Sequence, residues 1–264
     1  MKLVTRLIAY IRSRPIVGGT VVAGDGGIAK AGEKGVAAAG YGGTAITGFR
    51  GTATSGDRGI ATADEKGTAV SGDGGKATVG DRGTATAGYN GTAIAGVKGT
   101  AAAGERGTSK VGYEGTATAG DFGVAEAGCG GAAITGYSGT STAGVDGIAM
   151  AGHKGTAKAG SGGTAKAGER GFSSVEGRGT ATVGNGGTAM GGVGSVISIS
   201  YWDGDRVRIH IAHVKDKDGH GRLEPNVPYR LDENGKFVIA GQPPAKSFDQ
   251  SQASRGDQHG CEVE

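Results

Sequence analysis

Residues 83–98 read GTATAGYNGTAIAGVK, which is two successive copies of one eight-residue unit. The unit repeats 22 times without an insertion between Gly19 and Gly194, and every copy begins with glycine. Glycine also fills the sixth position of each unit except at Asp64 and Glu176. A fixed short period of this kind is typical of proteins built from stacked repeats.

Within each unit, the third and fifth positions carry small residues, whereas the second and fourth vary in size and polarity. The third position is alanine in 18 units, and Ser109, Ser141 and Ser173 are close substitutes. This period-two alternation predicts a strand with its small face inward and its variable face toward solvent. The seventh and eighth positions vary freely, so we expect a turn there. The flanking glycines would allow positive φ or close backbone approach.

Two units can close one coil of sixteen residues, and three units would close a triangular coil. An Ala/Ser interior favours two, because it suits two sheets that lie close together. The chain is therefore predicted to be all-β, a parallel β-solenoid of about eleven coils and roughly 50 Å, held by backbone hydrogen bonds between coils. Tyr41, Tyr89 and Tyr137 lie 48 residues apart, which predicts that they share one edge of the solenoid, three coils apart.

Four segments are predicted along the chain: an amphipathic helical cap at 1–16, the solenoid at 17–194, a small β cap or binding module at 195–242, and a flexible tail at 243–264. In the first segment, Leu3, Leu7 and Ile11 share one helical face, which would cover the open end of the solenoid. Its basic residues leave a membrane-surface helix as an alternative.

In the third segment, residues 196–202 and 206–214 are predicted to be strands, joined by a tight turn at Asp203-Gly204. Residues 229–238 are predicted to hold a hairpin.

Composition excludes several classes of function. The formal charge is +3, from 28 basic and 25 acidic residues, so there is no strong nucleic-acid signal. No run of about 18 apolar residues could span a membrane, and no secretion signal is recognised at the start. A cytoplasmic location is the default expectation, with Cys129 and Cys261 as unpaired thiols.

No catalytic residues, cofactor or metal site are predicted. Residues 216–219 read DKDG and suggest a calcium loop, but Val214 and Pro225 stand where an EF-hand needs oxygen ligands. His210 and His213 would face opposite sides of a strand, so they would not easily share a metal. No convergent set of side chains indicates an enzyme.

Residues 39–48 read AGYGGTAITG and resemble the AGYGSTxTAG repeat of bacterial ice-nucleation proteins, a family with nested periods of 8, 16 and 48 residues. The resemblance covers about two-thirds of the chain. It implies a stacked β-solenoid in which rows of Thr-x-Thr order water. The chain departs from the family in carrying alanine where the family's second face, S-x-L-T, has leucine. Glycine- and alanine-rich units also resemble the head repeats of trimeric autotransporter adhesins, although those repeats have a different period.

Two candidate binding surfaces follow from the sequence. The first is a threonine face that a sixteen-residue coil would align, comprising Thr52, Thr54, Thr68, Thr84, Thr86, Thr100, Thr116 and Thr118. The second is a set of aromatic and basic contacts in the end module, comprising Tyr201, Trp202, Arg206, Arg208 and Tyr229.

Three functions compete on this basis. The first hypothesis is a non-enzymatic rigid rod that docks a protein partner or a second copy of itself, such as a phage or mobile-element inhibitor of a host protein. The second is an ice-binding or water-ordering protein that uses the threonine rows. The third is an adhesin-like surface rod, which the missing export signal disfavours.

Overall fold

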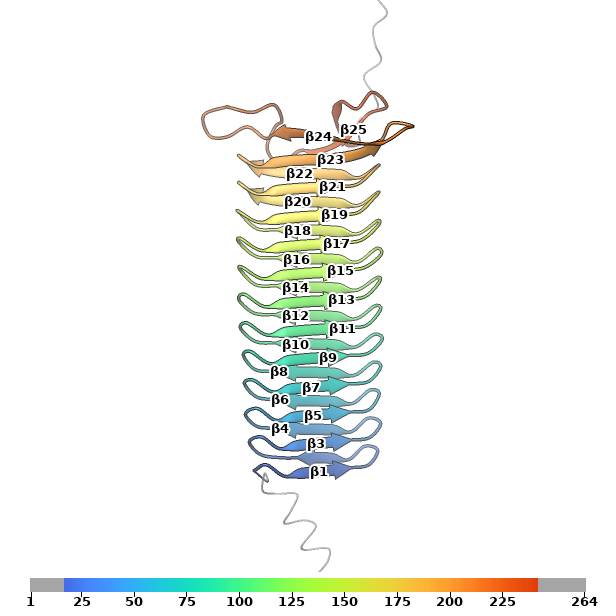
Figure 1. Cartoon of the computed structure of the whole chain (residues 1–264), viewed down its shortest axis with the longest axis vertical. Helices are drawn as coiled ribbons and strands as arrows, with labels where there is room; N and C mark the ends of the chain where they lie inside the picture. Colours follow the sequence, from blue (N-terminus) through green and yellow to red (C-terminus); the bar gives the residue numbers. More distant parts are fainter. Residues whose placement is uncertain (1–16, 242–264) are drawn as a thin grey trace, which may run out of the picture.

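The computed structural model describes residues 17–241, so the helical cap predicted at 1–16 and the tail predicted at 243–264 lie outside the described residues. Two 13-stranded sheets run the length of a rod (Figure 1). The odd-numbered strands form the first sheet: β1 (Thr20–Ala23), β3 (Val36–Ala39), β5 (Thr52–Ser55), β7 (Thr68–Ser71), β9 (Thr84–Ala87), β11 (Thr100–Ala103), β13 (Thr116–Ala119), β15 (Ala132–Thr135), β17 (Ile148–Ala151), β19 (Thr164–Ala167), β21 (Thr180–Val183) and β23 (Val196–Trp202), followed by β24 (Val207–His213).

The even-numbered strands form the second sheet: β2 (Ile28–Lys30), β4 (Thr44–Thr47), β6 (Ile60–Ala63), β8 (Lys76–Val79), β10 (Thr92–Ala95), β12 (Thr108–Val111), β14 (Val124–Ala127), β16 (Thr140–Ala143), β18 (Thr156–Ala159), β20 (Phe172–Gly177) and β22 (Thr188–Val193), followed by β25 (Pro228–Leu231) and β26 (Phe237–Ile239).

Each coil has two sides, as predicted. Within the repeat, neighbouring strands of a sheet are parallel and offset by sixteen residues, so Thr84 lies beside Thr100 and Thr100 beside Thr116. The amide of Thr100 donates to the carbonyl of Gly83 in the preceding coil at 2.9 Å, and the amide of Thr116 donates to Gly99 at the same distance. These bonds repeat along the rod and join each coil to the next.

The interior is built from columns of alanine. From Ala29 onward the third position of the unit is fully buried, as at Ala101, Ala117 and Ala133, which are 0% exposed and stand in register on consecutive coils. The fifth position is also buried in most units and takes up the few larger residues, such as Val79 and Val183. The predicted inward orientation of the small face is confirmed.

Most glycines at the first and sixth positions lie where an added Cβ would meet atoms of the same or the preceding coil. A Cβ added at Gly91 would lie 2.7 Å from the Cβ of Ala87, and one added at Gly88 would lie 2.9 Å from the amide of Asp73 in the preceding coil. Positive φ falls at the eighth position instead, often on residues other than glycine, as at Arg82 (57°) and Lys98 (54°). Each turn resembles a type II turn, whose third residue needs this conformation.

The aspartates and tyrosines of the 48-residue series contact each other along one edge, through a bond that Asp57 and Asp81 also make to the amides of Asp73 and Val97. The carboxylates of Asp25, Asp73 and Asp121 accept hydrogen bonds from the amides of Tyr41, Tyr89 and Tyr137 in the following coils, at 2.7–2.9 Å. Each aspartate therefore satisfies a turn amide that the β ladder leaves open, and the tyrosines share one edge as predicted.

The C-terminal segment closes the rod by reversing the chain. β23 continues the odd sheet in parallel with β21, and β24 then pairs with β23 in the antiparallel sense. β25 pairs antiparallel with β22, and β26 with β25. The strand predicted at 196–202 and the hairpin predicted within 229–238 are confirmed. Here the core changes from alanine to Ile197 and Ile199, which are 0% and 1% exposed.

Candidate functional site: an uncharged face of the solenoid

The second and fourth positions of each unit, which are the first and third residues of each odd strand, point out of the coil, because the third and fifth positions of the unit point inward. From β1 to β17 these outward positions include no charged residue, and the first charge on this sheet is Lys166 on β19. Nine strands with two outward residues each give 18 positions, which we call the uncharged face: Thr20, Val22, Val36, Ala38, Thr52, Thr54, Thr68, Val70, Thr84, Thr86, Thr100, Ala102, Thr116, Thr118, Ala132, Ile134, Ile148 and Met150.

All eight threonines of the predicted binding face lie on the uncharged face. The second position of the unit is threonine on five consecutive coils, from Thr52 to Thr116, and these residues are in register. The spacing along this column is about 4.8 Å, set by the strand separation. Between Ala38 and Ile134, the fourth position of the unit alternates between threonine and an apolar residue from one coil to the next, as in the series Thr54, Val70 and Thr86.

The opposite face of the rod differs in charge. The outward positions of β2 to β22 include Lys30, Lys76, Lys110, Glu126 and Lys158. The ammonium of Lys110 lies 2.7 Å from the carboxylate of Glu126, and this hydrogen bond raises the pKa of Lys110. Both side chains are exposed, so the pair contributes little to stability.

The predicted contacts of the end module have different surroundings. Trp202 is 56% exposed, at the end of β23. Tyr201 is partly buried and packs edge-to-face on His210, with ring centroids 5.2 Å apart. Tyr229 is only 6% exposed, and its hydroxyl accepts a hydrogen bond from the amide of Glu224 at 2.8 Å. Tyr229 therefore supports the cap from inside.

The two predicted arginines are exposed; Arg206 lies in the β23–β24 turn and Arg208 lies on β24. The guanidinium of Arg208 pairs with the carboxylate of Asp203, which also accepts hydrogen bonds from the amides of Asp205 and Arg206. Because the amide of Arg206 and the guanidinium of Arg208 stabilise the carboxylate, the pKa of Asp203 is lowered to about 2. This aspartate holds the turn that the sequence predicted at 203–204.

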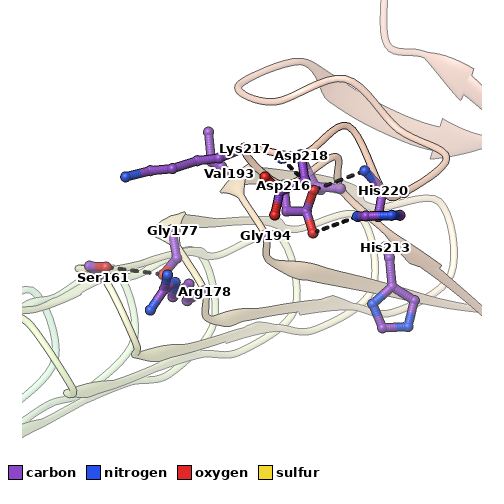
Figure 2. A pocket seen from close by; sticks show the side chains of 12 residues that line it. Ser161, Gly177, Arg178, Val193, Gly194, His213, Asp216, Lys217, Asp218 and His220 are labelled. Atoms are coloured by element: carbon purple, nitrogen blue, oxygen red, sulfur yellow. Dashed lines mark hydrogen bonds and ion pairs between the residues drawn. The ribbon is translucent and has the colours of Figure 1, made fainter.

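An open hollow of about 1000 Å³ lies beside the cap, lined in part by Arg178, His213 and Asp216 (Figure 2). Ligand atoms of Asp216, Asp218 and His220 lie within 4.8 Å of one another. The carboxylate of Asp216 already accepts hydrogen bonds from the amides of Asp218 and His220, which lowers its pKa, with the His220 bond as the largest cause. These contacts hold a tight turn, in line with the sequence-based interpretation of this loop.

The exposed apolar residues of β24 were not predicted from the sequence. Val207, Ile209 and Ile211 are 62%, 63% and 63% exposed. The alternation VRIHIAH was visible, but it predicts the apolar side to be inward. The register shows the reverse, because Ile209 and Ile211 lie opposite Ser200 and Ser198, whose neighbours Ile197 and Ile199 fill the core.

No family model, curated protein or solved structure matches the chain. The sixteen-residue coil with threonine-rich strands agrees with the architecture that the resemblance to ice-nucleation repeats implied. Within residues 17–241, no helix combines the length and the hydropathy needed to cross a membrane.

Proposed function

We propose that this chain is a non-enzymatic binding protein, a rigid two-faced rod whose uncharged face docks a macromolecular partner. The observation that carries the proposal is the charge asymmetry between the two outward faces. Charged residues make up 20% of the chain, yet none occupies the 18 outward positions of the uncharged face. Five occupy the corresponding positions of the even sheet.

Charge depletion matters because a charge that is buried on binding loses its hydration. The cores of protein interfaces are accordingly depleted of lysine and glutamate. Nine strands spaced about 4.8 Å apart, each about 13 Å wide, give a projected area of roughly 500 Å². A standard interface covers about 800 Å² per partner. The uncharged face is thus large enough to form the centre of such an interface.

The rod also supplies rigidity. Every coil is bonded to its neighbours through backbone hydrogen bonds, and the alanine columns leave no large side chains to rearrange. A preformed surface loses little conformational entropy on binding, which favours affinity.

Site-specific photo-crosslinking tests the proposal. A photoreactive residue at Thr100, on the uncharged face, should capture a partner in a lysate of the source cell, and one at Thr92, on the even sheet, should not. Equal capture at both positions would refute it.

Ice binding is a second candidate, favoured by the threonine column from Thr52 to Thr116. Five hydroxyl-bearing side chains stand in one row at about 4.8 Å intervals, on a face without charges. The test is inhibition of ice growth by the purified chain. Ice binding predicts faceted crystals with the parent, and loss of the effect in Thr84→Lys/Thr100→Lys but not in Thr92→Lys/Thr108→Lys. Normal growth with folded parent protein would exclude it.

A further inference from the structure

The last strand of the odd sheet, β24, has one side along which no other strand pairs. Within the described residues, β24 pairs only with β23, and it lies at the end of the rod opposite β1 (Figure 1). Val207, Ile209 and Ile211 project from the outward face of this strand, and each is more than 60% exposed. Trp202 lies opposite Val207 on β23 and extends the same apolar patch.

The pairing pattern shows which main-chain groups of β24 are free. At one end of the ladder the backbone amide of Asp203 donates a hydrogen bond to the carbonyl of Arg206. At the other end the backbone amide of Val214 donates to the carbonyl of Ser195. Since bonded pairs alternate in an antiparallel ladder, residues 208, 210 and 212 bond to β23. The amides and carbonyls of residues 207, 209 and 211 therefore point away from it.

The neighbouring loop does not cover this edge. The carbonyl of His213 accepts hydrogen bonds from the amides of Arg222 and Leu223, so the loop closes the edge at that residue. No other described segment pairs with residues 207–211. Natural proteins normally protect an edge strand with charged side chains, a proline or a bulge. The outward side chains of β24 are three β-branched apolar residues, the composition that favours pairing with another strand, and its charged residue, Arg208, lies on the other face of the strand.

The spacing of the apolar residues along β24 favours a second copy of the same strand as its occupant. The apolar residues are spaced symmetrically about Ile209, so an antiparallel copy centred there places Ile209 opposite the partner's Ile209 and Val207 opposite the partner's Ile211. By contrast, residues 242–264 read QPPAKSFDQSQASRGDQHGCEVE, which lacks the apolar alternation that would complement this stripe.

We propose that two copies of the chain pair through β24 in a two-fold antiparallel dimer centred on Ile209. Six main-chain hydrogen bonds form between the free groups of residues 207, 209 and 211 in the two copies. Their six side chains make one apolar cluster on the outward surface. A self-complementary contact of this kind closes as a dimer. Because the two-fold axis is perpendicular to the sheet, the uncharged faces of both copies point the same way. The proposal does not depend on what that face binds.

Sedimentation analysis of the full chain over a range of concentrations is the first test. The parent should show a reversible monomer–dimer equilibrium. Ile209→Lys places two lysines opposite each other at the centre of the contact, so it should weaken the dimer by roughly tenfold or more. Ile60→Lys is the matched control, since Ile60 is a 45% exposed isoleucine on the even sheet. It should dimerise like the parent. A monomeric parent, or an Ile209→Lys variant that dimerises like the control, would overturn the proposal.

Disulfide trapping tests the register in a background in which Cys129 and Cys261 are replaced by serine. Ile209→Cys should give a covalent dimer on mild oxidation, because opposed residues of a bonded antiparallel pair have Cα atoms about 5.5 Å apart. Val207→Cys alone should not cross-link, but a mixture of Val207→Cys and Ile211→Cys should. Efficient cross-linking of Val207→Cys by itself would show a different contact and contradict the proposed one.

Discussion

Replacing Ala117 with leucine tests whether the interior of the solenoid is as tightly packed as the alanine columns indicate. Ala117 lies on β13, is 0% exposed, and has Ala101 and Ala133 at the same position in the adjacent coils. Leucine adds three carbon atoms at this point. The side chain must enter the space between the two sheets, because the strand register fixes its direction inward.

The sign of the stability change distinguishes two possibilities. If the interior had room, burying three carbons would stabilise the protein by about 2.4 kcal/mol, at about 0.8 kcal/mol each. If it is close-packed, the extra volume forces side chains and backbone apart, at a cost of about 1–3 kcal/mol. The neighbouring coils lie only about 4.8 Å away and repeat the same alanine, so we expect the second outcome. For a chain of this size, that cost lowers Tm by about 2–12 °C.

Thermal unfolding followed by circular dichroism measures the effect. Thr118→Leu is the matched control, because Thr118 is the next residue on the same strand and its side chain is exposed. It adds a leucine to the surface and should leave Tm nearly unchanged. An Ala117→Leu variant that melts at or above the temperature of the control would refute the packing described here.

Further predictions concern hydroxyls and a carboxylate. Ser109 is fully buried with no hydrogen-bond partner for its hydroxyl within the described residues, so Ser109→Ala should raise the free energy of unfolding by about 1 kcal/mol. Ser141 is equally buried but bonds to Thr135 and to a backbone carbonyl, so Ser141→Ala should lower it by about 1 kcal/mol. Urea titration measures both, and shifts of the same sign would contradict the assignment. The pKa of Asp203 is lowered to about 2 in the folded chain, so its stabilisation of the β23–β24 turn is complete above about pH 4 and is lost as the pH falls through about 2. The fluorescence of Trp202, the only tryptophan, should report this step. Asp203→Asn should abolish the step, and a step that persists in that variant would assign it to another group.

The solenoid could be predicted from sequence because one local rule is repeated 22 times. Small residues at the third and fifth positions specify which side of each strand is buried, and Ala117 or Ala133 alone would not have done so. The side-by-side placement of Thr84, Thr100 and Thr116 follows once two units make one coil. The edge that carries Tyr41, Tyr89 and Tyr137 was predictable for the same reason.

Other features could not be predicted because they depend on contacts between coils. Arg82 and Lys98 do not favour positive φ, so they hide the signal that Gly42, Gly74 and Asn90 give at the same eighth position of other units. The hydrogen bond from the Tyr89 amide to Asp73 needs the register of adjacent coils. At β24, apolar alternation predicts a buried face, but the pairing with β23 directs Ile209 and Ile211 to solvent.

The most direct test of the central claim compares two charge variants in a binding assay. Thr84→Lys/Thr100→Lys places adjacent charges on the uncharged face, and Thr92→Lys/Thr108→Lys places them at the same unit position of the even sheet, where the two residues are also in register. Immobilised parent and variants are exposed to a lysate of the source cell, and the bound proteins are quantified. If the uncharged face docks a partner, the parent and the Thr92/Thr108 variant should retain a protein that the Thr84/Thr100 variant loses. Equal retention by both variants would contradict it.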